Sequence, residues 1–289
     1  KTSVNVVKAW NDNSNQDGLR KESIKVRLLA NGEATDNVIV LNASNNWRGQ
    51  FTDLDEYKAG NLIEYSVEEV DVPEGYEVSL GGTAETGYIL TNNHDPELID
   101  LSGSKTWDDA ENQDGKRPES ITVRLLADGT EVATQEVTAG EDITWTYTFT
   151  DLPKFADGEV INYTVQENTV KDYSTVIDGL DITNSYTPGK TSVNVIKDWS
   201  DNKDQDGKRP ESINVRLLAN GEATDNVIVL NADSNWQGQF TDLEQYKERK
   251  LIEYSVVEVD VPEGYEVSLD GTAKTGYVLT NSHTPEVIE

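Results

Sequence analysis

The sequence contains no cysteine and no methionine, and only two of its 289 residues are histidine. Without cysteine, disulfides and thiolate metal sites are excluded, and the lack of oxidisable sulfur suits an exposed extracellular protein. No apolar run approaches the length of a transmembrane helix, so we expect no membrane insertion. No signal peptide opens the sequence at Lys1. If the protein is secreted, we therefore expect this chain to be a piece of something longer.

Positive charge is also scarce. The chain has 24 Lys and Arg residues against 54 Asp and Glu residues, which gives a formal net charge of −30. Such a surface repels nucleic acid and anionic membranes, so neither is expected as a partner. Six tryptophans, twelve tyrosines and a hydrophobic content of 35% argue against a disordered polyanion. The length fits two or three domains.

The sequence repeats itself. The segment VRLLANGEATDNVIVLNA occurs without change at 26–43 and at 215–232, and a more divergent unit lies between the two copies. Lys8, Lys105 and Lys197 mark the same point in three units, which gives a period of about 92 to 97 residues. Fixed periods of this kind indicate tandem domains. We predict three of them, with these bounds: 1–97, 98–188 and 189–289.

Within each unit, short segments of β-branched and aromatic residues alternate with polar ones, as in VNVVKAW (4–10) and TWTYTFT (144–150). Asp-Gly and Asn-Gly pairs separate the segments and predict turns. The pattern predicts an all-β sandwich of about seven strands per repeat. The only helix-like patches are short ones near Tyr57, Phe155 and Tyr246.

A lysine occupies the apolar phase of the first predicted strand of each repeat. Lys8 shares a face with Val6 and Trp10 because alternate residues of a strand point the same way. Lys105 and Lys197 occupy the equivalent positions in the other repeats. We therefore predict that each repeat buries one lysine.

A glutamate and an asparagine follow the same rule on two later strands. Glu69 is in phase with Tyr65 and Val67, and Asn92 is in phase with Leu90. The equivalent residues of the other repeats are Glu167 and Asn184, and Glu258 and Asn281. Each repeat is thus predicted to bury one Lys, one Glu and one Asn.

Buried charges must pair or change protonation state. Complete burial lowers a lysine pKa and raises a glutamate pKa by roughly 3–5 units. A neutral amine beside a carboxamide can attack its carbon while the glutamate polarises the carbonyl and carries protons. Ammonia leaves and an amide bond remains. Two other interpretations stay open: a buried Lys–Glu ion pair with a hydrogen-bonded Asn, and a lysine that reaches solvent from a sheet edge.

These motifs resemble the B-type repeats of collagen-adhesin-like surface proteins of Gram-positive bacteria, the Cna B-type domains. The motifs are V-x-K-x-W at 6–10, N-Q-D-G at 15–18, Y-[ST]-V-x-E at 65–69 and L/I-T-N at 90–92, and they recur in the same order in the other two repeats. In the middle repeat the first motif is S-K-T-W, with Gly103 where the other repeats have valine. The resemblance covers essentially the whole chain.

The resemblance implies a reversed immunoglobulin-like (prealbumin-like) β-sandwich that carries an internal Lys–Asn isopeptide bond, formed with the help of a glutamate. Residue by residue, it implies the bonds Lys8–Asn92, Lys105–Asn184 and Lys197–Asn281, with Glu69, Glu167 and Glu258 as the catalytic residues. The expected chemistry occurs once per domain and needs no cofactor, so the protein is not expected to be a turnover enzyme.

The expected function is that of a stalk. A bond from the first strand to the last would span 84, 79 and 84 sequence positions in the three repeats, and the connections at 93–104 and 185–196 are short. We expect a stiff, monomeric spacer in an extracellular, cell-wall-anchored adhesin, with the adhesive domain N-terminal to the array. A pilin-like shaft subunit is the alternative within the same class.

Two binding functions remain as alternatives. Aromatic residues recur on one predicted strand and are candidates for a ligand-binding stripe, although strand phase favours a core role: Trp47, Phe51, Trp145, Phe149, Trp236 and Phe240. The oxygen-bearing residues Asn15, Asp17, Asp204 and Asp206 precede glycines, as at the start of a calcium loop. The twelfth loop position holds Ile24 or Ile213 instead of an acidic residue, so turn residues are favoured and no metal is expected.

Overall fold

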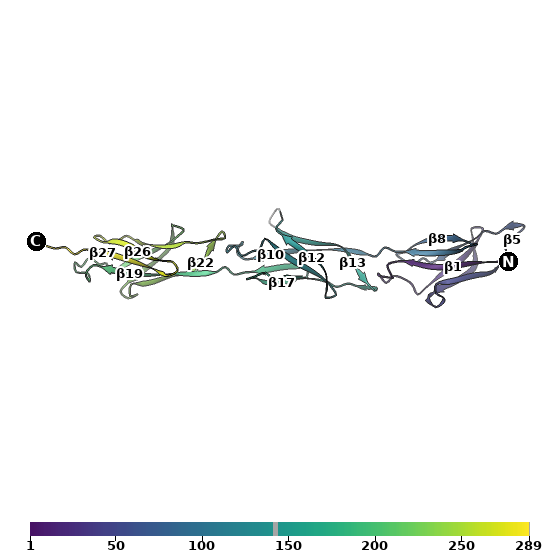
Figure 1. Cartoon of the computed structure of the whole chain (residues 1–289), viewed down its shortest axis with the longest axis horizontal. Coiled ribbons are helices and arrows are strands. Elements are labelled where there is room, and N and C mark those ends of the chain that lie inside the picture. The colour runs from purple at the N-terminus through teal and green to yellow at the C-terminus, as the bar shows by residue number, and fades with distance from the viewer. Residues whose placement is uncertain (141–143, 289) are drawn as a thin grey trace. The chain divides into compact units, whose positions relative to one another are not determined.

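The structure is a computed structural model that describes residues 1–140 and 144–288. It contains three β-sandwiches, one for each sequence repeat, which follow one another along the coloured chain in Figure 1. The predictions of an all-β fold and of three repeats are confirmed. No helix in the described part of the chain is long and apolar enough to cross a membrane.

The first repeat is built from one sheet of four strands and one of three, with a two-residue ladder beside them. The four-stranded sheet has the order β4-β1-β9-β8, and the three-stranded sheet has the order β3-β2-β7. Its strands are β1 (Thr2–Asn11), β2 (Ser23–Ala30), β3 (Glu33–Asn42), β4 (Arg48–Leu54), β5 (Tyr57–Lys58), β6 (Asn61–Leu62), β7 (Tyr65–Val70), β8 (Glu77–Thr83) and β9 (Gly87–Asn93).

The second repeat has the same arrangement, with the sheets β13-β10-β18-β17 and β12-β11-β16. Its strands are β10 (Leu98–Asp108), β11 (Ser120–Ala127), β12 (Thr130–Thr138), β13 (Trp145–Pro153), β14 (Phe155–Ala156), β15 (Glu159–Val160), β16 (Tyr163–Glu167), β17 (Ser174–Asp178) and β18 (Asp181–Ser185).

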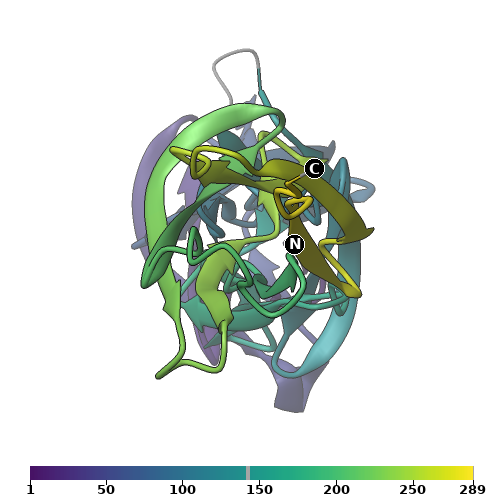
Figure 2. The same ribbon diagram turned by 90° about the vertical axis from the view of Figure 1, so that its left-hand side faces the viewer.

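The third repeat, coloured green to yellow in Figure 2, has the sheets β22-β19-β27-β26 and β21-β20-β25. Its strands are β19 (Lys190–Ser200), β20 (Ser212–Ala219), β21 (Glu222–Asn231), β22 (Gln237–Glu244), β23 (Tyr246–Lys247), β24 (Lys250–Leu251), β25 (Tyr254–Val259), β26 (Glu266–Thr272) and β27 (Gly276–Ser282). The repeated order means that each sandwich places its first and last strands side by side.

The three segments with a helix-like sequence pattern do not form helices. The residues near Tyr57, Phe155 and Tyr246 form two-residue antiparallel ladders, β5 with β6, β14 with β15 and β23 with β24. Tyr57, for example, pairs with Leu62. A two-residue strand is too short to show an alternating pattern, so the sequence carries no strand signal there. The one helical element in the described residues is a 3-10 turn at Ala43–Asn45.

The Asn-Gly and Asp-Gly turns behave as predicted. Asn31 and Gly32 join β2 to β3 with φ of 51° and 80°. Two consecutive positive φ values are typical of the tight type I′ hairpin turn, which Asn-Gly favours. Asp128 and Gly129 make the same turn in the second repeat. These turns fix the register of each β2–β3-type hairpin.

Two interactions of the first strand define the sandwich. β1 pairs antiparallel with β4 and parallel with β9, so the first and last strands of the repeat run side by side in the same direction. The chain therefore enters β1 at one end of the sheet and leaves β9 at the other. β19 and β27 pair in the same way in the third repeat.

The core of the first repeat lies between its two sheets. The buried hydrophobic cluster comprises Val4, Val6, Ile24, Val26, Leu28, Leu41, Phe51, Leu54, Val67 and Leu90. Phe51 is 5% exposed, and Trp47 packs against the same cluster. The third repeat has an equivalent cluster around Phe240, with Trp236 packed against it. Closely packed interiors of this kind hold the polar residues of β1, β7 and β9 in fixed positions.

Candidate functional site

The predicted lysine, asparagine and glutamate lie in the interior of each sandwich. The exposed fraction is 4% for each lysine and 0% for each asparagine: Lys8, Lys105, Lys197, Asn92, Asn184 and Asn281. Glu69 is 9% exposed and Glu258 is 5% exposed, and the side chain of Glu167 is 1% exposed. The side chain of Lys105 is 0% exposed, so it does not reach solvent from the sheet edge.

The parallel pairing brings the lysine and the asparagine to neighbouring strands. Lys8 pairs with Leu90 and Trp10 pairs with Asn92. Asn92 therefore lies two residues along β9 from the point opposite Lys8, on the same face of the sheet. The tryptophan–asparagine pair recurs as Trp107 with Asn184 and as Trp199 with Asn281.

The glutamate reaches the site from the three-stranded sheet. In the first repeat, Asn92 Nδ2 donates a hydrogen bond to Glu69 Oε1 over 2.9 Å. In the third repeat, Asn281 Nδ2 donates to Glu258 Oε1 over the same distance. The carboxyl of β7 or β25 thus contacts the carboxamide of the last strand directly.

Each of these sites also contains buried polar atoms without a partner. Among the described residues, Glu69 Oε2 and Asn92 Oδ1 have no hydrogen-bond partner, and the same holds for Glu258 Oε2 and Asn281 Oδ1. Buried polar atoms without a partner are rare because they lose their interactions with water and gain nothing in return. An ion pair with an ordinary hydrogen-bonded asparagine would leave these atoms without a partner.

In the middle repeat the contacts differ. Lys105 Nζ lies 3.8 Å from Glu167 Oε1, and Glu167 Oε2 accepts a hydrogen bond from Thr175 Oγ1 over 3.0 Å. Among the described residues, neither Nδ2 nor Oδ1 of Asn184 has a hydrogen-bond partner. The structure therefore brings the lysine close to the glutamate here and leaves the asparagine without a hydrogen bond to the carboxyl.

Burial changes the proton affinities of these groups in the direction that the chemistry needs. Burial lowers the pKa of Lys8, Lys105 and Lys197 to about 8, although the nearby glutamate opposes the change. Burial also raises the pKa of Glu69 and Glu258 against the effects of the asparagine and the lysine. Both changes favour the neutral forms, an amine that can act as a nucleophile and a carboxyl that can donate a proton.

A tryptophan covers the lysine, and an arginine packs against the same tryptophan. Lys8 Nζ lies 4.0 Å from the centre of the Trp10 ring, and the Arg20 guanidinium lies 5.2 Å from the same ring. Trp10 also packs edge-on against Trp47 and Tyr76. The positive charge of Arg20 adds to the lowering of the lysine pKa. The Trp10 ring packs against the amine, which also donates a hydrogen bond to the backbone carbonyl of Ala9 over 2.6 Å.

The sequence reasoning missed a buried carboxylate beside this cover. Asp12 is 2% exposed, pairs with the Arg20 guanidinium and accepts a hydrogen bond from the Tyr76 hydroxyl over 2.7 Å. Burial would raise the pKa of Asp12, but the hydrogen bonds from Arg20, Tyr76 and Asn15 lower it below its usual range. Asp12 therefore fixes the arginine that packs on Trp10.

The same network occurs in all three repeats. Its members in the other two are Asp109, Arg117 and Tyr173, and Asp201, Arg209 and Tyr265. A sequence signal for it exists, since an aspartate follows each predicted lysine by four positions and an arginine follows that aspartate by eight. The spacing shows no function by itself, because the tyrosine comes from a distant segment.

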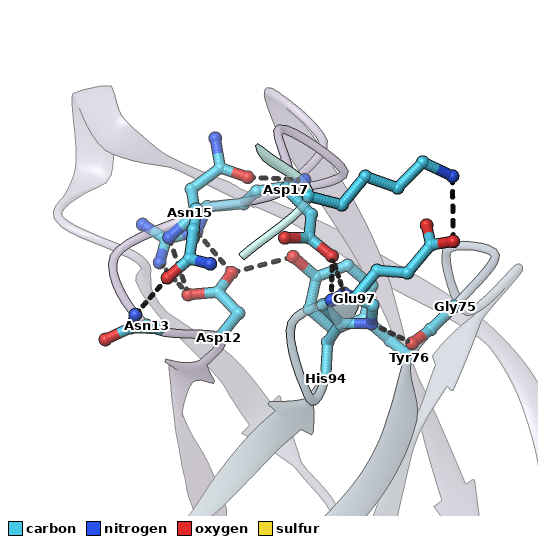
Figure 3. A network of polar contacts seen from close by, with 11 residues as sticks. Asp12, Asn13, Asn15, Asp17, Gly75, Tyr76, His94 and Glu97 are labelled. Atoms are coloured by element: carbon cyan, nitrogen blue, oxygen red, sulfur yellow. Dashed lines mark hydrogen bonds and ion pairs between the residues drawn. The ribbon is translucent and has the colours of Figure 1, made fainter. Parts of the chain in front are cut away.

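The oxygen-bearing residues proposed as weak calcium candidates have other partners (Figure 3). Asp17 Oδ2 accepts hydrogen bonds from His94 Nε2 and from the backbone N–H of Glu97, both over 2.8 Å. Asn15 Oδ1 accepts from the backbone N–H of Arg20. These residues hold the loop after β1 and the segment that follows β9.

The third repeat uses its candidates in the same way. Asp206 Oδ2 accepts from His283 Nε2 and from the backbone N–H of Glu286, and Asp204 Oδ1 accepts from the backbone N–H of Arg209. No group of three or more metal-binding side chains with suitable geometry occurs among the described residues. The turn interpretation of these residues is favoured over calcium binding.

The middle repeat anchors its last segment with a tyrosine instead of a histidine. Asp114 Oδ2 accepts a hydrogen bond from Tyr186 Oη and another from the backbone N–H of Gly189, each over 2.8 Å. The aspartate of the N-Q-D-G or D-Q-D-G motif thus has one task in all three repeats. It holds the chain as it leaves the sandwich.

The aromatic residues considered for ligand binding belong to the core. Trp145 and Phe149 are 6% and 7% exposed, and Trp145 packs edge-on against Trp107 at 5.3 Å between ring centres. Trp236 makes the same contact with Trp199 at 5.2 Å. These rings pack against the tryptophans that cover the buried lysines, so they serve the core.

Comparison with known proteins places the chain in a family. The Cna protein B-type domain model matches residues 4–93, 101–185 and 193–282. The chain is 45% identical over 285 residues to a collagen adhesin of Staphylococcus aureus, an alignment that covers 99% of the chain and 24% of that adhesin. The chain thus spans about a quarter of the length of this relative.

A solved structure agrees with this assignment. The crystal structure of two B repeat units of the collagen binding protein of Staphylococcus aureus is 44% identical, with a TM-score of 0.59, and the match covers 98% of this chain and 75% of that one. The sequence resemblance and the sandwich topology point to the same family. The chain therefore belongs to the Cna protein B-type domain family, with three such domains in tandem.

Proposed function

We propose that the three repeats form the stalk of a bacterial surface adhesin, and that a Lys–Asn isopeptide bond locks each repeat. One observation carries the proposal: each sandwich buries a lysine and an asparagine on its first and last strands, which pair in parallel, with a glutamate beside them. The proposed bonds are Lys8–Asn92, Lys105–Asn184 and Lys197–Asn281. The proposed domain bounds are 1–97, 98–188 and 189–289.

The proposed reaction replaces one amide by another. The neutral amine of Lys8 attacks Cγ of Asn92 and forms the new C–N bond, and the C–N bond to the carboxamide nitrogen breaks. Glu69 donates a proton toward the carboxamide as the amine attacks, takes a proton from the attacking nitrogen, and the leaving group departs as ammonia. The fold supplies the high effective concentration that this slow reaction needs, because both partners are held on adjacent strands.

The parallel pairing explains what the bond would do under tension. Because β1 and β9 run in the same direction, a force on the two ends of the repeat shears these strands past each other. A bond between Lys8 and Asn92 would carry that force directly, and the 84 sequence positions that it spans could not extend. Loop closure of this length also restricts the unfolded chain, which is worth about 4 kcal/mol by analogy with disulfides.

The family suggests where such a stalk works. We propose that the chain belongs to an extracellular, cell-wall-anchored protein of a Gram-positive bacterium, because its relative is a collagen adhesin. In this proposal an adhesive domain precedes the repeats, and the repeats themselves act as a monomeric spacer. The expected chemistry is a single turnover in each domain, so the repeats are not enzymes in the usual sense.

High-resolution intact mass of the purified chain tests the proposal. We expect a mass three ammonia losses below the sequence value, and a tryptic digest should yield three branched peptides at the proposed residues. Lys8→Ala, Lys105→Ala and Lys197→Ala should each restore one loss relative to the mass of that variant's own sequence. The matched control Lys25→Ala removes an exposed lysine of β2 and should keep all three losses. An unshifted mass would rule out the bonds and leave ordinary buried ion pairs.

A further inference from the structure

The residue that faces the reactive asparagine differs between the repeats. In the last hairpin of the first repeat, Val78 of β8 pairs with Asn92. In the third repeat, Val267 pairs with Asn281. In the middle repeat, the same position holds Thr175, which pairs with Asn184. A hydroxyl thus stands where the other two repeats have a methyl group.

The hydroxyl changes the partners of the glutamate. Thr175 Oγ1 donates to Glu167 Oε2 over 3.0 Å, and Glu167 makes no hydrogen bond to Asn184 within the described residues. The valines cannot donate, and in their repeats the asparagine donates to the glutamate over 2.9 Å. In the middle repeat the donor to the glutamate is thus the threonine hydroxyl instead of the asparagine, and Glu167 Oε1 has no hydrogen-bond partner among the described residues.

This arrangement acts against amide formation because it separates the glutamate from the carboxamide. In the first and third repeats the glutamate accepts a hydrogen bond from the carboxamide nitrogen that has to leave. In the middle repeat Glu167 Oε2 lies 3.0 Å from Thr175 Oγ1 and Glu167 Oε1 lies 3.8 Å from Lys105 Nζ, so no hydrogen bond among the described residues joins the proton-transferring carboxyl to the leaving nitrogen.

We propose that Thr175 is a positioning residue that slows amide-bond formation in the middle repeat relative to the first and third repeats. This inference rests on the proposed function, because it concerns the rate of the same reaction. The bond between Lys105 and Asn184 then forms last after the chain folds. Since the variant loses the hydrogen bond from Thr175 to Glu167, Thr175→Val should speed bond formation in the middle repeat about tenfold.

The experiment follows bond formation in the full chain. Cell-free synthesis is stopped, samples are quenched in acidic denaturant at successive times, and the branched peptide of each repeat is quantified by mass spectrometry. We expect the peptide that joins Lys105 to Asn184 to accumulate more slowly than the other two. In Thr175→Val it should accumulate at the rate of the first repeat, and the reciprocal Val78→Thr should slow the first repeat by a similar factor.

Thr175→Ser separates positioning from a merely structural effect. Serine keeps the hydroxyl, so this variant should retain the slow rate of the wild type, while hydrogen exchange of the middle repeat checks that each variant folds. Equal rates in Thr175→Val and the wild type would overturn the role of the hydroxyl even when all three bonds form. If the wild type forms no branched peptide in any repeat, the proposed function itself fails. Glu167→Gln should abolish only the bond of the middle repeat.

Discussion

The first and third repeats are near copies of each other, whereas the middle repeat reaches the same strand register with shorter strands. Its last two strands, β17 and β18, have five residues each, against seven in β8 and β9. Its parallel pairing has four residue pairs, against six in the first repeat. The tryptophan of the first strand nevertheless pairs with the asparagine of the last in all three. The register of these two strands, and not the length of the hairpin, places the reactive residues.

The middle repeat also exchanges a large and a small core residue. In the first repeat, Val6 pairs with Gly49, and a Cβ added to Gly49 would lie only 2.7 Å from a side-chain atom of Ile39. In the middle repeat the corresponding residues are Gly103 and Tyr147, and Tyr147 is 2% exposed. The glycine that departs from the family motif is therefore matched by a buried ring, which supplies the volume that the valine gives elsewhere.

The largest expected effect is mechanical. In a single-molecule pulling experiment on the full chain, the wild type should show no extension of the loops enclosed by the bonds. Lys8→Ala should add an unfolding step of about 290 Å and Lys105→Ala one of about 275 Å, because 84 and 79 positions are released. The free energy of unfolding of the altered repeat should fall by about 4 kcal/mol.

The same experiment can show whether the middle repeat lacks the bond that the other two repeats form. A wild-type chain that shows one step of about 275 Å and no other would lack the bond of the middle repeat alone. Lys25→Ala, which removes an exposed lysine of the first repeat, should leave the traces unchanged.

A smaller effect, equal in the repeats, is expected from the Asp12 network. Asp12→Ala and Asp109→Ala each remove the acceptor of an arginine and a tyrosine, so the free energy of unfolding of the affected repeat should fall by about 2 kcal/mol. Hydrogen exchange in urea, resolved by repeat, measures the change. Asp36→Ala, at an exposed carboxylate, should have no effect. A marked difference between the first two variants would show that the network is not equivalent in the two repeats.

The smallest expected effect concerns pH. Both ring nitrogens of His94 face acceptors, Asp17 Oδ2 and the carbonyl of Gly75, so only the imidazolium donates to both. The hydrogen bond to Asp17 raises the pKa of His94 above its ordinary value of 6.5, although burial opposes it. The stabilisation that comes from donating both hydrogen bonds at once is therefore fully present below about pH 6.5. It is lost as the pH rises through the raised pKa of His94. Protection of the Glu97 amide from hydrogen exchange should fall over that range.

The middle repeat provides the control for this prediction. The hydrogen bond to Asp114 raises the pKa of Tyr186 to about 12, so protection of the Gly189 amide should stay constant between pH 6 and 8. His94→Tyr should make the first repeat equally insensitive. Titration of the His94 ring by NMR measures the pKa directly, and an unraised value would contradict the proposed contact.

Much of the fold could be predicted from the sequence because its signals are local. The three repeats follow from copied segments, the strands from period-two alternation, and the hairpin turns from Asn-Gly and Asp-Gly pairs. The burial of Lys8, Glu69 and Asn92 also follows from alternation, since a strand that packs one face on a core must bury every residue of that phase.

Other features depend on segments that are far apart in the sequence. The two-residue ladders, such as β5 with β6, are too short to carry a pattern. Tyr76 reaches Asp12 across 64 positions, and no local spacing predicts that contact. The difference between Thr175 and Val78 is visible in the sequence. Its effect on the site can be inferred only from the hairpin, which pairs that residue with the asparagine.

The sequence by itself determined the repeat, the strand class and the set of residues that enter the core, because each of these depends on neighbours along the chain. The tertiary structure alone decided which buried groups meet. It pairs the first strand with the last in parallel and packs the aromatic cover over the amine. It also brings the glutamate to the asparagine in the first and third repeats and to the lysine in the middle repeat. These contacts depend on the register and packing of two sheets, which are set by the folded chain as a whole.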